Sequence, residues 1–106
     1  MKWYRFEIDE YLDSTEHLLD SEDLAYRRLL DMYYITETPL PNDIRLLEVA
    51  IRLNKEEFER VLEEFFVLTP DGYRHLQADM WLKKRIHQRD INLQAGLKGG
   101  RRKKVV

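Results

Sequence analysis

The sequence predicts a mainly α-helical domain with one small β-hairpin, followed by a projecting C-terminal helix and a disordered basic tail. Three observations support this fold class. Apolar residues recur at helical spacing in three segments before residue 67. A Pro-Asp-Gly turn at residues 70–72 separates two short β-prone runs. Beyond Leu82 the chain is basic and holds too few apolar residues to form a wide stripe.

The first 36 residues combine an aromatic, acidic start with a clear helix. Residues 3–6 are either a short strand or an aromatic arm packed on the body, and residues 7–23 hold apolar residues at loosely helical spacing. A helix is expected from about Glu22 to Thr36, with Ser21 as its N-cap and acidic residues in its first turn. Its broad apolar stripe consists of Ala25, Tyr26, Leu29, Leu30, Met32 and Tyr33.

Two further short helices are expected between residues 42 and 66. Pro39 and Pro41 end the first helix because proline fixes its own φ and disfavours helical geometry in the residue before it. Asn42 is expected to cap a helix that ends near Leu53. Asn54 and the glutamate three residues later resemble a capping box. The apolar residues after this box keep amphipathic spacing: Phe58, Val61, Leu62, Phe65 and Phe66.

The C-terminal third begins with the hairpin. Residues 66–69 and 73–76 are β-prone, and Gly72 supplies the positive φ that the turn between them requires. A helical pattern returns over residues 77–94 and is expected to project beyond the core. The glycines at positions 96, 99 and 100 are expected to break this helix, which leaves the last ten residues disordered when unbound.

The order of these elements suggests a domain organisation. Three helices followed by a hairpin is the order found in a winged helix-turn-helix, although a helical bundle with an added hairpin gives a similar pattern. We expect a winged-helix-like globular domain over residues 1–82. Residues 83–106 are expected to form a basic helix extension and a flexible tail rich in Gly, Arg and Lys. With 106 residues, 43% of them apolar, the chain has the size of one domain with its own core.

The composition excludes several classes of protein. There is no cysteine, so neither disulfides nor thiolate metal sites can form. No window approaches 18 consecutive apolar residues, and the N-terminal residues lack the apolar run of a secretory signal. We therefore expect a cytoplasmic protein without a membrane segment.

The net charge of −2 conceals a strong asymmetry along the chain. Residues 1–79 hold 9 Lys and Arg against 19 Asp and Glu, or −10, whereas residues 80–106 hold 9 against 1, or +8. A basic arm on an acidic body most often binds nucleic acid, and less often an anionic membrane or an acidic protein surface. The candidate phosphate-contacting residues are Lys83, Lys84, Arg85, Arg89, Lys98, Arg101, Arg102, Lys103 and Lys104.

Two other surfaces bear on partner binding. Arg74 in the hairpin either enters a minor groove or pairs with Asp71 or a helix carboxylate. The polar face of the third helix holds two cations and five glutamates, and its net charge of −3 opposes insertion into a DNA groove. This face is expected to be solvated or to bind a protein through Glu56, Glu59, Arg60 and Glu63.

The aromatic residues have two readings. They either form a platform on which bases stack or belong to the core, and helical spacing favours the core. The residues in question are Trp3, Tyr4, Phe6, Tyr11, Tyr26, Tyr33 and Tyr34.

No catalytic, metal or cofactor site is expected. The acidic stretch from Asp9 to Asp20 lacks the spacing and the glycine of a calcium loop, so a solvated surface explains it better. His75 and Asp79 suggest no third metal ligand. The sequence also has no glycine-rich phosphate loop and no nucleophile motif. We therefore expect that the protein is not an enzyme.

Several motifs occur in one order along nearly the whole chain. They are Tyr4-x-Phe6-x-Ile8-x-x-Tyr11-Leu12, Ala25-Tyr26-Arg27-Arg28-Leu29-Leu30, Pro39-Leu40-Pro41, Val61-Leu62-x-x-Phe65-Phe66 and Asp71-Gly72-Tyr73-Arg74-His75, followed by a glycine and basic tail from Ala95 to Lys104. Together they resemble the YdaU-like family of phage and prophage proteins. The resemblance implies an N-terminal, winged-helix-like module of phage replication proteins, working in the cytoplasm of a bacterial host cell.

These observations lead to one main functional expectation and one alternative. We expect a phage-derived, non-catalytic DNA-binding module whose basic tail contacts phosphates without sequence preference. Its acidic body would contact a replication protein or a second copy of the chain. The alternative is a protein-interaction adaptor with no direct nucleic-acid contact. A sequence-specific repressor is a third hypothesis, disfavoured by the acidic third helix.

Overall fold

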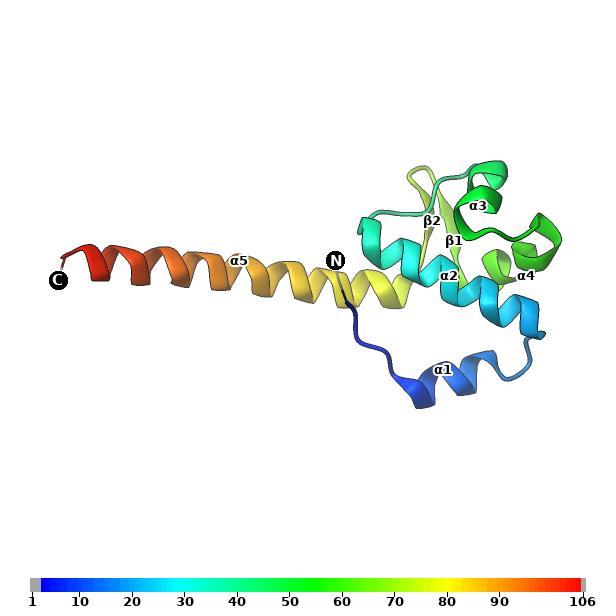
Figure 1. The fold of residues 1–106 in the computed structure, drawn as a ribbon, viewed down its shortest axis with the longest axis horizontal. Helices are drawn as coiled ribbons and strands as arrows, with labels where there is room; N and C mark the ends of the chain where they lie inside the picture. The colour runs from blue at the N-terminus through cyan, green and yellow to red at the C-terminus, as the bar shows by residue number, and fades with distance from the viewer. Residues whose placement is uncertain (1–2, 106) are drawn as a thin grey trace.

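The computed structural model describes the backbone of residues 3–105 and the side chains of residues 3–96. Within this range the fold is mainly α with a small antiparallel hairpin, which confirms the predicted fold class (Figure 1). The elements are α1 (Ile8–Thr15), α2 (Asp20–Thr36), α3 (Ile44–Ile51), α4 (Lys55–Phe65), β1 (Val67–Thr69), β2 (Gly72–Arg74) and α5 (Leu76–Val105).

A third short segment joins the hairpin. In the hairpin itself Leu68 lies opposite Tyr73. On the other side of β2, Leu40 forms an isolated antiparallel bridge with Tyr73, through N–H to carbonyl bonds of 2.9 and 2.8 Å in the two directions. The chain order is therefore α2, the Leu40 bridge, α3, α4 and the hairpin. This is the order of elements in a winged helix-turn-helix.

The core forms around α2, which packs against α3, α4 and α5. As the amphipathic patterns predict, the buried apolar residues come from the inner faces of α2, α3 and α4, and they are joined by residues of α5 and by Leu40 and Phe66. They are Ala25, Tyr26, Leu29, Leu30, Tyr33, Tyr34, Leu40, Leu47, Ile51, Phe58, Val61, Leu62, Phe66, Ala78 and Leu82. The assignment of aromatic residues to the core is confirmed for Tyr26, Tyr33 and Tyr34. Tyr4 and Tyr11 are partly buried and pack against the core, whereas the assignment is wrong for Trp3 and Phe6, which are 60% and 38% exposed.

Carboxylates determine where the three central helices begin. The Glu22 carboxylate accepts a hydrogen bond from the Leu19 N–H (3.0 Å), so α2 begins at Asp20 and the predicted Ser21 cap is wrong. Asp43 caps α3 by accepting from the Leu46 N–H (3.1 Å), in place of Asn42. A carboxylate makes the stronger, charge-assisted bond to a backbone N–H. At α4 the predicted contact is confirmed, because Glu57 accepts from the Asn54 N–H (3.0 Å).

The N-terminal residues 3–7 form an aromatic arm rather than a strand, and they lead into α1. The hydroxyl of Tyr4 donates to Asp31 of α2 (2.5 Å), and its ring stacks on Tyr34 at 4.0 Å. Tyr11 of α1 donates to Asp23, also on α2. The arm and α1 are therefore held against α2 through two tyrosine–aspartate hydrogen bonds and ring contacts. Burial, followed by these hydrogen bonds, raises the pKa of both phenols above the ordinary value.

The last helix, α5, runs without interruption from the core to Val105 and projects away from the body (Figure 1). The predicted helix break at the glycines, and with it the disordered tail, is therefore wrong. A glycine keeps both backbone hydrogen-bonding groups and costs a helix only about 1 kcal/mol relative to alanine. The Leu, Lys and Arg residues that surround these glycines are good helix formers, which favours continuation of the helix. None of the helices in the described part of the chain is both long enough and apolar enough to cross a membrane.

Candidate nucleic-acid interface and aromatic pocket

The two lysines at the base of α5 are free to meet a partner. Lys83 and Lys84 are both exposed, and neither forms an ion pair with any side chain in residues 3–96. They directly follow Leu82, which lies one turn beyond Ala78, and both of these buried residues anchor α5 in the core. The predicted phosphate contact therefore has two available cations where the projecting helix leaves the body.

The two arginines that follow are already engaged. The guanidinium of Arg85 lies 4.8 Å from the ring centre of Trp3 and 5.8 Å from that of Trp81, and its Nε is buried without a hydrogen-bond acceptor. This cation–π contact joins the arm to α5. Arg89 pairs with Glu37 at the end of α2 (2.9 Å). The phosphate contacts predicted for Arg85 and Arg89 stay a prediction, and in the structure both side chains hold α5 to the rest of the molecule.

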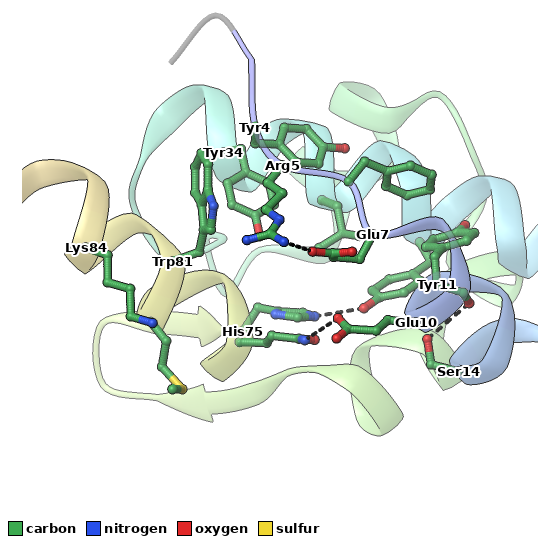
Figure 2. A pocket seen from close by; sticks show the side chains of 15 residues that line it. Tyr4, Arg5, Glu7, Glu10, Tyr11, Ser14, Tyr34, His75, Trp81 and Lys84 are labelled. Atoms are coloured by element: carbon green, nitrogen blue, oxygen red, sulfur yellow. Dashed lines mark hydrogen bonds and ion pairs between the residues drawn. The ribbon is translucent and has the colours of Figure 1, made fainter. Parts of the chain in front are cut away.

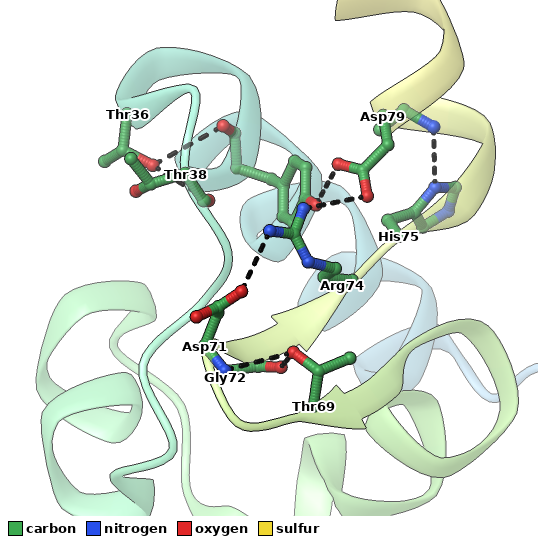
Figure 3. Close-up of polar contacts among 10 residues, drawn as sticks. Thr36, Thr38, Thr69, Asp71, Gly72, Arg74, His75 and Asp79 are labelled. Atoms are coloured by element: carbon green, nitrogen blue, oxygen red, sulfur yellow. Dashed lines mark hydrogen bonds and ion pairs between the residues drawn. The ribbon is translucent and has the colours of Figure 1, made fainter.

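The wing arginine is also engaged. Arg74 donates to Asp71 of the turn and to Asp79 of α5, both at 3.3 Å (Figure 3). These hydrogen bonds raise the pKa of the Arg74 guanidinium. Asp79 accepts a further hydrogen bond from Tyr33, whose pKa is raised to about 12, first by burial and then by this bond. The pairing alternative for Arg74 is thus the observed one, and the side chain is directed to its own fold.

The remaining predicted cations lie on the distal part of α5, whose backbone is helical to Val105. Their side chains lie outside the described residues, so their contact with phosphates stays a prediction. They are Lys98, Arg101, Arg102, Lys103 and Lys104.

The acidic face of α4 is partly used within the body. Arg60 pairs with the buried Glu22 of α2 at 3.7 Å, and Lys55 lies 3.9 Å from Glu59. Within the described part of the chain, Glu56 and Glu63 are exposed and form no ion pair. The face therefore keeps a net negative charge, which would repel phosphates in a DNA groove. Of the four residues predicted to bind a protein, Glu56 and Glu63 are the ones left free.

Sequence reasoning missed an aromatic pocket beneath the N-terminal arm (Figure 2). A cavity of about 340 Å³ lies between the arm, α1, α2 and the beginning of α5. We call it the arm pocket. Its aromatic lining consists of Tyr4, Phe6, Tyr11, Tyr26, Tyr34, His75 and Trp81, and its polar lining consists of Arg5, Glu7, Glu10, Ser14, Gln77 and Lys84. The signal in the sequence was the tyrosine-rich spacing of residues 4–34, which was assigned to the core.

His75 organises the inner wall of the arm pocket. Its Nδ1 accepts a hydrogen bond from the Ala78 N–H (3.1 Å), and its Nε2 lies 2.8 Å from the Tyr26 hydroxyl. Burial lowers the pKa of His75, so the ring is neutral near pH 7. Because Nδ1 is an acceptor, the single ring proton is on Nε2 and is donated to Tyr26. The Tyr26 hydroxyl proton then has no acceptor among the described residues.

The described residues contain no cluster that would favour a metal. Nowhere in this part of the chain do three or more His, Asp or Glu side chains converge as a set of ligands. The amide of Gln77 donates a hydrogen bond to the carboxylate of Glu10 at 3.1 Å.

Comparison with known proteins identifies a family but no individual relative. Residues 2–89 match the model of a family described as "Protein of unknown function (DUF1376)". Comparisons with curated proteins and with solved structures find no match. The matched span includes Lys83 and Lys84 and ends at Arg89, before the five distal cations.

Proposed function

The chain belongs to the DUF1376 family of proteins of unknown function, and for this member we propose a phage-derived, non-catalytic module that binds nucleic acid through α5. The phage origin and the role in replication rest on the motifs that resemble the YdaU-like family. Binding through α5 rests on charge and exposure. The acidic body is left to dock a replication protein or a second copy of the chain.

One observation carries the proposal. Lys83 and Lys84 are exposed and free of ion pairs within residues 3–96, at the point where a basic helix leaves a body of charge −10. By contrast, the helix that would enter a DNA groove in a winged helix-turn-helix, α4, presents unpaired carboxylates. The geometry therefore favours phosphate contact along α5 over insertion of α4.

Such binding has a defined physical signature. Each phosphate that a lysine or arginine neutralises releases a condensed counterion, so the affinity falls steeply as salt is added. Contacts with phosphates carry no direct information on sequence. The proposed module would hold DNA firmly at low salt and discriminate little between sequences.

A protein-interaction adaptor is the second candidate. It is favoured by the exposure of Glu56 and Glu63 on α4, which offers a negative surface to a basic partner. In that case α5 would bind an acidic protein surface instead of nucleic acid.

Fluorescence anisotropy with labelled single- and double-stranded DNA separates the two candidates. The test variant is K83Q/K84Q, and the matched control is R45Q/K55Q, which removes the same charge from exposed positions on α3 and α4. We expect the test variant to bind more weakly. Its plot of log affinity against log salt should be shallower by about 0.9 for each duplex phosphate that is no longer neutralised. The control should retain the wild-type slope.

A shortened chain tests the distal cations without damaging the core. A chain ending at Ala95 keeps Leu82, the Arg85 cation–π contact and the Arg89–Glu37 ion pair, while it lacks the five distal cations. We expect a further reduction of affinity and of salt dependence. Failure of the full chain to bind either DNA at low salt would overturn the proposal and favour the adaptor.

A further inference from the structure

We propose that the arm pocket binds one unpaired nucleobase, so that the chain grips a single strand by a base as well as by its phosphates. The inference rests on the proposed function, because nucleic-acid binding through α5 brings the DNA strand that carries the base. It adds a ligand class and a second site to that function, because phosphate contacts alone do not distinguish single from double strands.

The walls of the arm pocket are suited to a flat aromatic ring. Tyr34 lies between Tyr4, which stacks on it at 4.0 Å, and Trp81, whose ring stands at 89° to it with centroids 5.5 Å apart. His75 and Tyr26 form the inner wall as a second near-parallel pair, 25° apart. A volume of about 340 Å³ accommodates a base with part of its sugar. Bases of every type stack on such rings, since each has a π-face.

The polar groups of the arm pocket complement the edge of a base. Tyr26 is 5% exposed, and its hydroxyl accepts from His75, which leaves its own proton for an acceptor on the ligand. Glu10 receives one hydrogen bond from Gln77 and keeps further lone pairs for a donor. Every base carries both acceptors and N–H donors on its edges. The arm pocket thus supplies one hydrogen-bond donor, the Tyr26 hydroxyl, and one acceptor, the Glu10 carboxylate. A purely apolar ligand would leave both groups without a hydrogen bond.

The position of Lys84 connects the arm pocket to the proposed phosphate contacts. Lys84 lines the arm pocket (Figure 2) and is adjacent in sequence to Lys83. Neither ammonium group forms an ion pair within the described residues. Arg5, the other cation of the lining, is already paired with Glu7 at 2.5 Å. A nucleotide whose base lies in the arm pocket would therefore direct its phosphate toward Lys84. The adjoining nucleotides of the same nucleic-acid strand would then lie along α5. An unpaired base in a strand and a free mononucleotide share this chemistry.

Tryptophan fluorescence reports occupation of the arm pocket directly. In a W3F variant Trp81 is the remaining tryptophan, so stacking of a base changes its emission. The probes are a short single-stranded DNA, a strand of equal length made only of abasic sites, and adenosine monophosphate. We expect the normal strand to change the emission and to bind about 5- to 150-fold more tightly than the abasic strand, the range of one stacked base.

Two substitutions test the polar contacts. Y26F removes the hydroxyl and keeps the ring, whereas E10Q changes an exposed carboxylate and leaves the core intact. Both substitutions should reduce the ratio of the affinity for the normal strand to the affinity for the abasic strand. The salt dependence of binding to the abasic strand should be unchanged. Thermal melting of each variant checks folding, and E10Q tests the inference even if Y26F is unstable.

The outcomes separate the inference from the proposed function. Equal affinity for normal and abasic strands, with no change in Trp81 emission, would overturn the arm pocket as a base site and leave phosphate binding intact. A response to adenosine monophosphate without binding of any strand would support the pocket and overturn the proposed function. A response to both strand and mononucleotide would support both.

Discussion

At the scale of single residues, His75 links the hairpin, the arm pocket and α5. It follows β2 directly, caps α5 through Nδ1 and donates through Nε2 to Tyr26, which is 49 residues away in the sequence. These contacts require the neutral ring, in agreement with the direction of its pKa shift. A buried histidine of this kind makes the fold sensitive to acid.

A histidine replacement tests this sensitivity. The folded pKa of His75 is below its ordinary value of about 6.5, so the unfolded chain binds the proton first and stability falls as the pH drops below about 6.5. In an H75N variant, in which asparagine can still cap α5, this decrease should be absent. The measurement is the free energy of unfolding in urea between about pH 5 and pH 7.5. Parallel curves for the two proteins would contradict the assignment, because the two chains differ only at position 75.

Gly72 is the second residue whose role depends on its surroundings. Its φ is +127°, and a Cβ built on it would lie 2.2 Å from the Leu40 carbonyl oxygen, the acceptor in the bridge to Tyr73. The glycine is therefore required both for the turn and for the close approach of the third segment of the sheet.

We expect G72A to destabilise the fold by at least about 1–3 kcal/mol, the cost of a strained backbone conformation, with the steric clash in addition. Urea denaturation measures the change, and G96A is a suitable control because nothing lies within 4 Å of a Cβ at Gly96. A decrease of less than about 0.5 kcal/mol, as for an ordinary surface substitution, would show that the turn tolerates a side chain.

At the scale of elements, α5 has two parts with different supports. Its first four turns are held by the buried Ala78 and Leu82, by the Arg85 cation–π contact and by the Arg89–Glu37 ion pair. Residues 90–96 are exposed. Over residues 90–96 the helix therefore depends on local hydrogen bonds and intrinsic propensity, which alone stabilise a helix only marginally.

A substitution in the projecting part should reveal this dependence. Because a Cβ at Gly96 meets no neighbour, G96A should stabilise the local helix by about 0.5–1 kcal/mol. Amide hydrogen exchange near residue 96 should slow by about two- to fivefold, the equivalent of that free energy. Exchange in α2 should be unaffected. An unchanged exchange rate around residue 96 would show that Gly96 does not lower the local stability of the helix.

At the scale of the whole molecule, charge and shape are both asymmetric. The principal extents are 62 × 30 × 22 Å and the radius of gyration is 17.8 Å, whereas a compact chain of this length has about 13 Å. The excess comes from α5, which carries the basic end of the sequence away from an acidic body (Figure 1). This separation reduces attraction between the two ends of one chain, and within the described side chains it leaves Lys83 and Lys84 exposed.

Small-angle scattering tests the projection. The full chain at moderate salt should have a radius of gyration near 18 Å, and the chain ending at Ala95 should be closer to the compact value of about 13 Å. A compact value for the full chain would mean that α5 folds back onto the acidic body. In that case the cations of α5 would form ion pairs with carboxylates of the same molecule.

Much of the fold could be predicted because it depends on local patterns. Helices α2, α3 and α4 follow from apolar spacing, and the hairpin follows from the Pro-Asp-Gly turn. The predictions that failed at the helix ends concern small free-energy differences. Whether Asn42 or Asp43 caps α3, and whether glycines stop α5, are decided by about 1 kcal/mol each.

The sequence by itself determined the element order, the core-forming faces and the division into an acidic body and a basic end, since composition and periodicity encode these directly. Only the tertiary structure decided which cations are free. Arg74, Arg85 and Arg89 find partners from other elements, Arg89 across 52 residues, and Lys83 and Lys84 do not within the described part of the chain. The arm pocket likewise needed the fold, because its walls come from segments up to about 80 residues apart that pattern reasoning treats separately. Contacts between distant segments depend on packing geometry, which no local pattern specifies.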